Sequence, residues 1–246
     1  MCGGPLAGTG SLPVCDACVS RIQPQSMTLC ERCGEALEMD SLRFVASLRP
    51  AEGLLCRPCR QVAPAFERAV AYGNYEGELR GMLHLLKYER VKQVAGIMGG
   101  RLAEATARLD GASTELTVVA VPLYPAKERA RGYNQSVLIA EAAVTELKRS
   151  GWRLRLERSA LRRVRDTESQ FALTPKERRE NLRGAFAVTD DAAFANREVL
   201  LVDDIYTTGA TARECARVLR RAGALKVWVA TVARAQTEMV EMWSGS

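Results

Sequence analysis

V-L-L-V-D-D-I-Y-T-T-G-A-T, residues 199–211, joins an apolar run, an acidic pair and a turn of small hydroxylated residues. The run at residues 199–202 is short and apolar enough to predict a buried parallel strand. Asp203 and Asp204 are expected at the carboxyl end of that strand, and a helix is expected to begin near Thr211. A strand, two carboxylates, a turn and a helix N-terminus in this order predict a site for a phosphorylated sugar.

Each part of the stretch suits one part of such a ligand. The backbone N–H groups of the turn and the positive end of the helix dipole would face a phosphate. The hydroxyls of Thr207 and Thr208 add donors, and Gly209 permits a close approach of the backbone. The carboxylates can accept hydrogen bonds from a sugar diol. The alternative is a strand and turn with incidental acids, which would cost stability because adjacent buried carboxylates repel each other.

The same stretch resembles the phosphoribosyl-pyrophosphate (PRPP) signature of type I phosphoribosyltransferases, which has four apolar residues, two acids and a T-T-G-x-T loop. The resemblance implies a catalytic role for Asp203 and Asp204, which would bind the ribose hydroxyls directly or through Mg²⁺. It also implies that the following loop holds the 5′-phosphate. The loop residues expected to bind PRPP are Tyr206, Thr207, Thr208, Gly209, Ala210 and Thr211.

Length and composition limit the class of protein. The 246 residues, 47% of them hydrophobic, predict one large domain or a medium domain with a small appendage. No apolar run approaches the roughly 20 residues of a membrane span, and residues 1–5 lack the features of a secretory signal, so we expect a cytoplasmic protein. The net charge of +6 arises after residue 64 and fits a phosphate-rich ligand, single-stranded nucleic acid or an ordinary basic surface.

Seven of the eight cysteines fall before residue 60. In a cytosolic protein such clustering favours metal binding over disulfides. A C-x-x-C pair lets both thiolates of one tight turn reach the same metal, and two pairs complete a tetrahedral zinc site. The spacing therefore predicts one closed structural zinc site made by Cys30, Cys33, Cys56 and Cys59.

Only three cysteines precede the predicted four-cysteine site, one fewer than a second such site would need. Cys15 and Cys18 form a third pair, and Cys2 resembles the second half of a further pair whose first cysteine would precede Met1. Either the chain start is truncated, or a second zinc is held by these three cysteines and a different fourth ligand. His84, expected in a distant helix, is not recruited as that ligand. A structural cap is the favoured interpretation; a nucleic-acid-binding ribbon and redox sensing are the alternatives.

After residue 64 helical and strand patterns alternate, which predicts an α/β domain. Strands are predicted near residues 66–75, 116–122, 154–161 and 226–232, and helices near 76–88, 91–108, 135–147 and 211–222. Short strands are also predicted between the cysteine pairs, at residues 34–55.

Two polar segments complete the expected site. Residues 122–135 predict a stiff basic loop at a strand's carboxyl end, where open α/β sheets bind ligands, although a solvated loop is the alternative. Its cations are Lys127, Arg129 and Arg131. Residues 162–183 form a long polar insertion, which is typical of a lid, a binding segment or disorder, with a capped helix start at Thr174 and Pro175.

Together these motifs resemble the ComF (ComFC) family, and the resemblance covers nearly the whole chain. The motifs that carry it are the paired cysteines, Leu86-Lys87-Tyr88, the R-G-Y-N-Q run at 131–135, Thr167-x-x-Gln170, Arg178-x-x-Asn181, Gly184-Ala185-Phe186 and the Asp203-Asp204 signature. The missing first cysteine is the departure from the family pattern.

The ComF resemblance implies an α/β fold of the type I phosphoribosyltransferase kind, with a mostly parallel central sheet flanked by helices. Residues 1–64 would form a small double zinc ribbon and residues 65–246 the phosphoribosyltransferase-like domain. PRPP would bind with Mg²⁺, and pyrophosphate would lie near Lys127, Arg129 and Arg131, with Lys87 as a further expected PRPP ligand. Thr167, Gln170 and Arg178 would belong to a lid.

The resemblance also implies a role in DNA uptake, with single-stranded DNA and the uptake machinery as partners. One hypothesis is an enzyme that transfers the phosphoribosyl group of PRPP to an acceptor and releases pyrophosphate. The other is a non-catalytic module that handles single-stranded DNA and uses the PRPP pocket as a regulatory site. No residue marks the general base for an acceptor, so the sequence does not identify what accepts the group.

Overall fold

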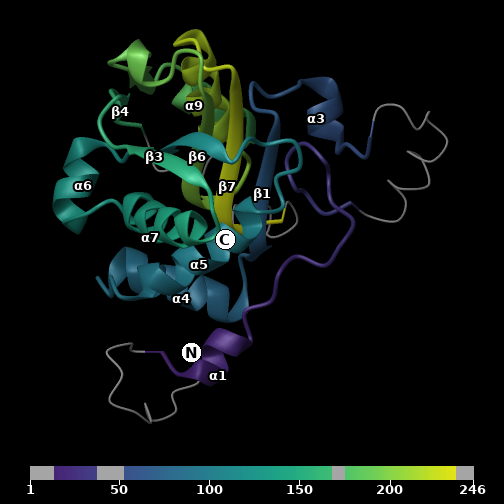
Figure 1. Ribbon diagram of the computed structural model, residues 1–246, viewed down its shortest axis with the longest axis vertical. Helices are drawn as coiled ribbons and strands as arrows, with labels where there is room; N and C mark the ends of the chain where they lie inside the picture. Colours follow the sequence, from purple (N-terminus) through teal and green to yellow (C-terminus); the bar gives the residue numbers. More distant parts are fainter. Residues whose placement is uncertain (1–13, 38–52, 168–174, 237–246) are drawn as a thin grey trace.

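The chain is built around a five-stranded parallel sheet (Figure 1). The computed structural model describes residues 14–37, 53–167 and 175–236. All neighbouring strands run parallel in the order β1-β7-β6-β2-β3. The predicted α/β class with a mostly parallel sheet is therefore confirmed. The strands are β1 (Arg68–Asn74), β2 (Glu115–Ala120), β3 (Arg153–Glu157), β6 (Glu198–Tyr206) and β7 (Lys226–Arg234).

Helices cover both faces of this sheet. Three helices pack on one face, where Leu200 and Val202 of β6 are buried with them. Helix α9 (Ala210–Arg221) packs on the other face, against Val199 and Leu201. Because successive residues of a strand point to opposite faces, a strand buried on both sides is apolar throughout, which explains the run at residues 199–202. The three helices of the first face are α4 (Gly77–Tyr88), α5 (Val94–Thr106) and α7 (Gln135–Arg149).

The basic loop predicted at residues 122–135 is instead mostly a short helix, α6 (Pro125–Arg131), so that prediction was wrong. Pro125 occupies the first turn, where its fixed φ angle favours a helix and its missing N–H is no loss. Gly132 ends the helix in a left-handed conformation. Lys127, Arg129 and Arg131 are consequently displayed on a helix.

Strand β6 continues to Tyr206, beyond the end expected from the sequence. Its neighbour β7 pairs with it as far as Tyr206 and Arg234, and this ladder keeps the backbone extended. Asp203 and Asp204 therefore lie within the strand rather than after it.

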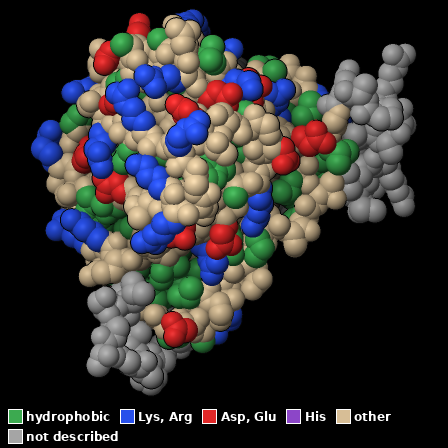
Figure 2. All heavy atoms as spheres, viewed as in Figure 1, with side chains coloured by type: hydrophobic (Ala, Val, Ile, Leu, Met, Phe, Trp, Pro, Cys, Tyr) green, Lys and Arg blue, Asp and Glu red, His purple; other side chains and the backbone are tan. Residues whose placement is uncertain are grey.

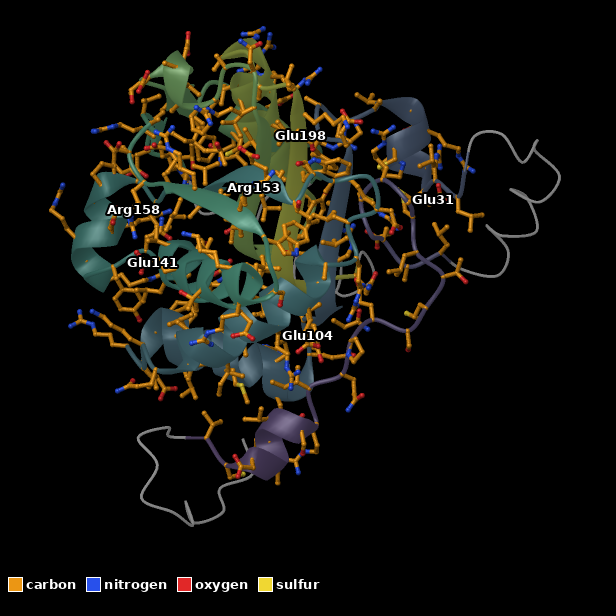
Figure 3. The ribbon with its side chains drawn as sticks, in the orientation of Figure 1. Glu31, Glu104, Glu141, Arg153, Arg158 and Glu198 are labelled. Carbon is orange, nitrogen blue, oxygen red and sulfur yellow. The ribbon has the colours of Figure 1, made fainter. Side chains whose placement is uncertain are left out.

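The strand predicted near residues 154–161 divides into β3 and β4 (Leu161–Arg163), and β4 pairs antiparallel with β5 (Phe186–Val188). Arg158, directly after edge strand β3, points toward Glu141 of α7 and pairs with it at 3.0 Å (Figure 3). The polar insertion contains the expected helix, α8 (Pro175–Leu182), while Thr174 lies outside the described residues. A 3₁₀ turn, Asp191–Ala193, precedes β6.

The cysteine-rich segment contributes two short helices, α1 (Asp16–Ser20) and α3 (Arg57–Gln61). The short strands predicted at 34–55 fall mostly on residues 38–52, outside the described residues. A backbone hydrogen bond of 2.8 Å from Ala69 to the carbonyl of Arg32 joins the segment to β1. The division into residues 1–64 and 65–246 stays a prediction. Across the described ranges, none of the helices combines the length and apolar character that crossing a bilayer requires.

Candidate functional site

The two carboxylates of β6 have different partners. Asp203 accepts hydrogen bonds of 2.9 Å from the Ser136 hydroxyl and from the backbone N–H of Asp204. Asp204 forms an ion pair with Lys87, whose Nζ lies 2.8 Å from its Oδ2. The Asp204 and Lys87 side chains are only 6% and 15% exposed. Lys87, which the sequence marked as a ligand of PRPP, is therefore placed against the acidic pair.

Burial governs the ionisation of this cluster. Burial and the neighbouring charge of Asp204 raise the pKa of Asp203 to about 7, although Lys87 and the hydrogen bonds from Asp204 N–H and Ser136 act in the opposite direction. At neutral pH Asp203 therefore holds its proton far more strongly than an ordinary aspartate does. Burial by itself would lower the pKa of Lys87, but the charges of Asp204 and Asp203 outweigh it and raise that pKa. Lys87 accordingly stays protonated.

The turn after β6 presents unused donors. Gly209 caps α9 with φ +74°, and no side chain caps the helix. The first amides of a helix have no intrahelical partner, so those of α9 are available to an anion. Thr208 Oγ1 is buried, and no hydrogen-bond partner lies near it among the described residues. A buried hydroxyl without a partner is costly, which is consistent with a ligand that supplies one.

A small pocket lies between Asp203 and the turn after β6. It has a volume of about 20 Å³, enough for about one water molecule. Asp203 reaches this pocket, whereas Asp204 is turned to Lys87. The pocket is lined by Asp203, Ile205, Tyr206, Thr207, Gly209, Thr211, Ala212 and Thr231.

The cations of α6 lie on the chain segment that leads to this cluster. Helix α6 follows β2 and is joined by Gly132, Tyr133 and Asn134 to α7, whose Ser136 contacts Asp203. Lys127 and Arg129 are exposed. Arg131 donates to Gln135, and its guanidinium carbon lies 5.8 Å from the centre of the Tyr88 ring.

The expected lid residues are only partly described. Thr167 is buried, and its hydroxyl accepts a hydrogen bond from Arg163. Gln170 lies outside the described residues. Arg178 belongs to helix α8. A lid role for these three residues stays a prediction.

The four predicted zinc ligands come together. The Sγ atoms of Cys30, Cys33, Cys56 and Cys59 all lie within 4.8 Å of one another, and all four residues are buried. Ligands about 2.3 Å from a tetrahedral zinc lie roughly 3.8 Å apart, so the cluster fits structural zinc. Four thiolates fill the coordination of such an ion, which favours a structural role.

The amino-terminal group is not assembled in the described residues. Cys15 caps α1, and Cys18 lies within that helix and is buried in the cluster that contains residues of α4 and α5. Arg21 Nη2 lies 3.2 Å from Cys18 Sγ. Cys2 lies outside the described residues, so the second zinc site stays a prediction.

A larger groove of about 570 Å³ lies at the amino ends of the strands, opposite the carboxyl ends that carry the acidic pair. Its lining includes Glu115, Arg153 and Glu198, which begin β2, β3 and β6, and the last two are labelled in Figure 3. Ligands of open α/β sheets bind at the carboxyl ends of the strands. The size of this groove therefore does not make it the candidate site.

Two groups of partner residues were absent from the predictions. Ser136 is the second residue of α7, two positions after the cap Asn134, and the predicted helix start was the signal that could have identified it. Arg213 and Arg234 approach the cysteine cluster from α9 and β7. Their separation from the cysteines in sequence gave no such signal.

Comparison with known proteins identifies the family. The chain is 31% identical over 233 residues to the DNA utilization protein YhgH of Escherichia coli (strain K12), which covers 93% of each chain. It belongs to the ComF family. A second ComF relative, Competence protein F of Haemophilus influenzae, is 28% identical over 228 residues, or 90% of each chain.

Two further comparisons accompany the ComF assignment. No family model matches the chain. The crystal structure of TT1426 from Thermus thermophilus has a TM-score of 0.35 and 22% identity to this ComF protein, and covers 61% of this chain and 78% of that chain.

Proposed function

We propose that this ComF protein binds PRPP at the carboxyl ends of its strands and transfers the phosphoribosyl group to an acceptor, releasing pyrophosphate. The observation that carries the proposal is the turn between β6 and α9. It combines an uncapped helix N-terminus with Thr208 Oγ1, a buried hydroxyl that has no partner among the described residues. Both features favour a bound phosphate.

The proposed sugar site lies beside this turn. Asp203 lines the pocket next to Thr207 and Thr211, so its carboxylate would accept a ribose hydroxyl while the turn holds the 5′-phosphate. The pocket has room for only one hydroxyl group, so the ribose ring would lie outside it, at the opening of the pocket. Asp204 would hold Lys87 beside the acidic pair through their ion pair.

Pyrophosphate leaves as a highly charged group. Lys127, Arg129 and Arg131 on α6 are the proposed cations near it, and Lys87 stays charged within the cluster. Mg²⁺ bound with PRPP would neutralise the developing charge on pyrophosphate. Carboxylates are ligands that Mg²⁺ accepts, and Asp203, which reaches the pocket, is the one proposed here.

Asp203→Asn is expected to weaken PRPP binding by about 10- to 100-fold, because a hydrogen bond to a charged group contributes roughly 1.5–3 kcal/mol. Isothermal titration calorimetry of the zinc-loaded protein with PRPP and Mg²⁺ measures the change. Asp110→Asn is the control, since Asp110 is an exposed carboxylate paired only with Arg68 in the described structure. Equal affinity of the Asp203 variant and the wild type would remove the ribose assignment.

We further propose a role in the use of imported DNA. Relatives that align with nearly the whole chain are named DNA utilization protein and Competence protein F. The net charge of +6 supports contact with a polyanion. On the face drawn in Figure 2, Lys and Arg side chains are spread among Asp and Glu rather than gathered in one patch. A dispersed charge favours weak, sequence-independent contact over a deep nucleic-acid groove.

Binding of single-stranded DNA is therefore expected to be strongly salt-dependent. If about four phosphates are neutralised, raising the salt from about 50 to 200 mM should weaken binding roughly 50-fold. The reason is that the logarithm of the affinity falls by about 0.7 per phosphate contact for each tenfold rise in salt concentration. Fluorescence anisotropy of a labelled oligonucleotide over a salt series gives the slope. The absence of binding at 50 mM salt would reject direct DNA contact.

The second candidate function is a non-catalytic module that binds DNA and uses PRPP as a regulator. The names of the relatives favour it, since they refer to DNA and to competence rather than to a transfer reaction. A pyrophosphate-release assay with nucleobases and single-stranded DNA as candidate acceptors separates the two. Release above the rate without acceptor supports the enzyme, whereas PRPP binding without release supports the module.

A further inference from the structure

Two arginines of the sheet domain reach the cysteine cluster. Arg213 lies in the first turn of α9, and its backbone N–H donates to the carbonyl of Gly209 at 2.9 Å. Its guanidinium donates to the Val62 carbonyl at 2.9 Å and lies 3.7 Å from Cys59 Sγ. The helix turn that would face phosphate is thereby attached to one of the two cysteine pairs.

Arg234, at the end of β7, reaches the other pair. Its Nη1 donates to the Cys33 carbonyl at 2.5 Å, and its Nη2 lies 3.8 Å from Cys33 Sγ and pairs with Glu35. The side chain is 3% exposed. The guanidinium carbon also lies 4.3 Å from the centre of the Tyr206 ring, a cation–π distance.

Tyr206 contacts both Arg234 and the turn after β6. A Cβ atom placed on Gly209 would lie 2.1 Å from the Tyr206 hydroxyl, so the ring rests directly on the backbone of Gly209. The four cysteines, Tyr206, Ala210 and Ala212 belong to one buried cluster. The cysteine cluster and the phosphate turn are therefore packed against each other with two arginines between them.

The charges explain why arginine suits these positions. Four thiolates around a divalent zinc leave a net charge of −2, and one guanidinium lies near each cysteine pair. Hydrogen bonds from the groups around a metal site orient its ligands and tune its affinity. Arg213 contacts Cys59 and belongs to the first turn of α9, and Arg234 contacts both Cys33 and the Tyr206 ring, so a change in the arrangement of the cysteines would reach the turn through both side chains.

We infer that Arg213 and Arg234 are positioning residues that couple the four-cysteine metal centre to the phosphate turn. Metal occupancy then sets the affinity of the turn for PRPP, and bound PRPP retains the metal. The inference rests on the proposed function, because PRPP is the ligand of that turn. Coupling between two binding sites is reciprocal, so each ligand must change the affinity for the other by the same factor.

Competition with a chromogenic chelator tests this reciprocity. Saturating PRPP is expected to raise the zinc affinity of the wild type by about tenfold, a typical coupling between sites. The effect should fall to less than twofold in Arg213→Gln and return in part in Arg213→Lys. Arg217→Gln, on the same helix but paired with Glu214, should keep the full effect. Equal effects in Arg213→Gln and Arg217→Gln would overturn the inference.

Hydrogen exchange gives a second readout that needs no PRPP. Removing zinc from the wild type should speed amide exchange in residues 207–212 while leaving residues 116–120 of β2 unchanged. An equal increase in both segments, or no increase in residues 207–212, would overturn the coupling. Failure of PRPP to bind zinc-loaded wild type counts instead against the proposed function, and the exchange result then decides the coupling alone.

Discussion

The substitution Gly209→Ala is expected to weaken PRPP binding by about 100-fold or more. Gly209 has φ +74°, a conformation that costs other residues roughly 1–2 kcal/mol. The added Cβ would also lie 2.1 Å from the Tyr206 hydroxyl and 2.4 Å from the ring carbon that bears it. Tyr206 is buried between Phe66 and Arg234, so the ring cannot yield without disturbing both. The backbone of the turn must therefore move, and its amides lose their common direction.

Calorimetry with PRPP measures the loss, and circular dichroism shows whether the variant keeps its fold. The matched control is Gly151→Ala. Gly151 has φ +88° and no atom within 4 Å of an added Cβ, so this control carries the backbone strain without the collision. Gly151 also lies in the connection between α7 and β3, at the amino end of that strand and therefore away from the turn after β6. Similar affinities of the two variants would show that the turn does not hold the phosphate.

Much of the fold was predictable because it depends on local patterns. The run at residues 199–202 is apolar at every position, as a strand buried on both faces must be, and β6 lies there. Helix α4 follows from Leu79, Met82, Leu83 and Leu86, which recur at helical spacing and are all buried. The four-cysteine site followed from spacing alone, since each pair forms its own turn.

The partners of the site residues were not predictable in the same way. Ser136 reaches Asp203 from 67 positions away, and Arg234 reaches Cys33 from 201 positions away. Such contacts are fixed by the strand order, which no local pattern contains. Helix α6 was missed for a different reason: the prolines and cations of residues 122–135 indicated a loop, yet Pro125 at the first helical turn favours a helix. The same residue type supports either interpretation, and its position decides.

Lys87→Met is expected to destabilise the protein by about 3–5 kcal/mol, the usual cost of removing one partner from a buried ion pair. Methionine fills nearly the same volume, so lost packing contributes little. The cost arises because Asp204, whose side chain is 6% exposed, would keep a charge without its counter-ion. Asp203 next to it adds to the repulsion whenever it is ionised, because its pKa is about 7. Urea denaturation monitored by tryptophan fluorescence measures the change in the free energy of unfolding.

Two comparisons separate the charge from other effects of the substitution. Lys226→Met removes a more exposed pair, because Lys226 is 44% exposed and lies 3.3 Å from Glu198, and it should cost no more than about 1 kcal/mol. The double variant Lys87→Met with Asp204→Asn removes the unpaired charge and should recover most of the lost stability. If the double variant were as unstable as Lys87→Met alone, the loss would come from packing rather than from the carboxylate. Recovery of stability without recovery of PRPP binding would further show that the Lys87–Asp204 pair is retained for the ligand and not for the fold.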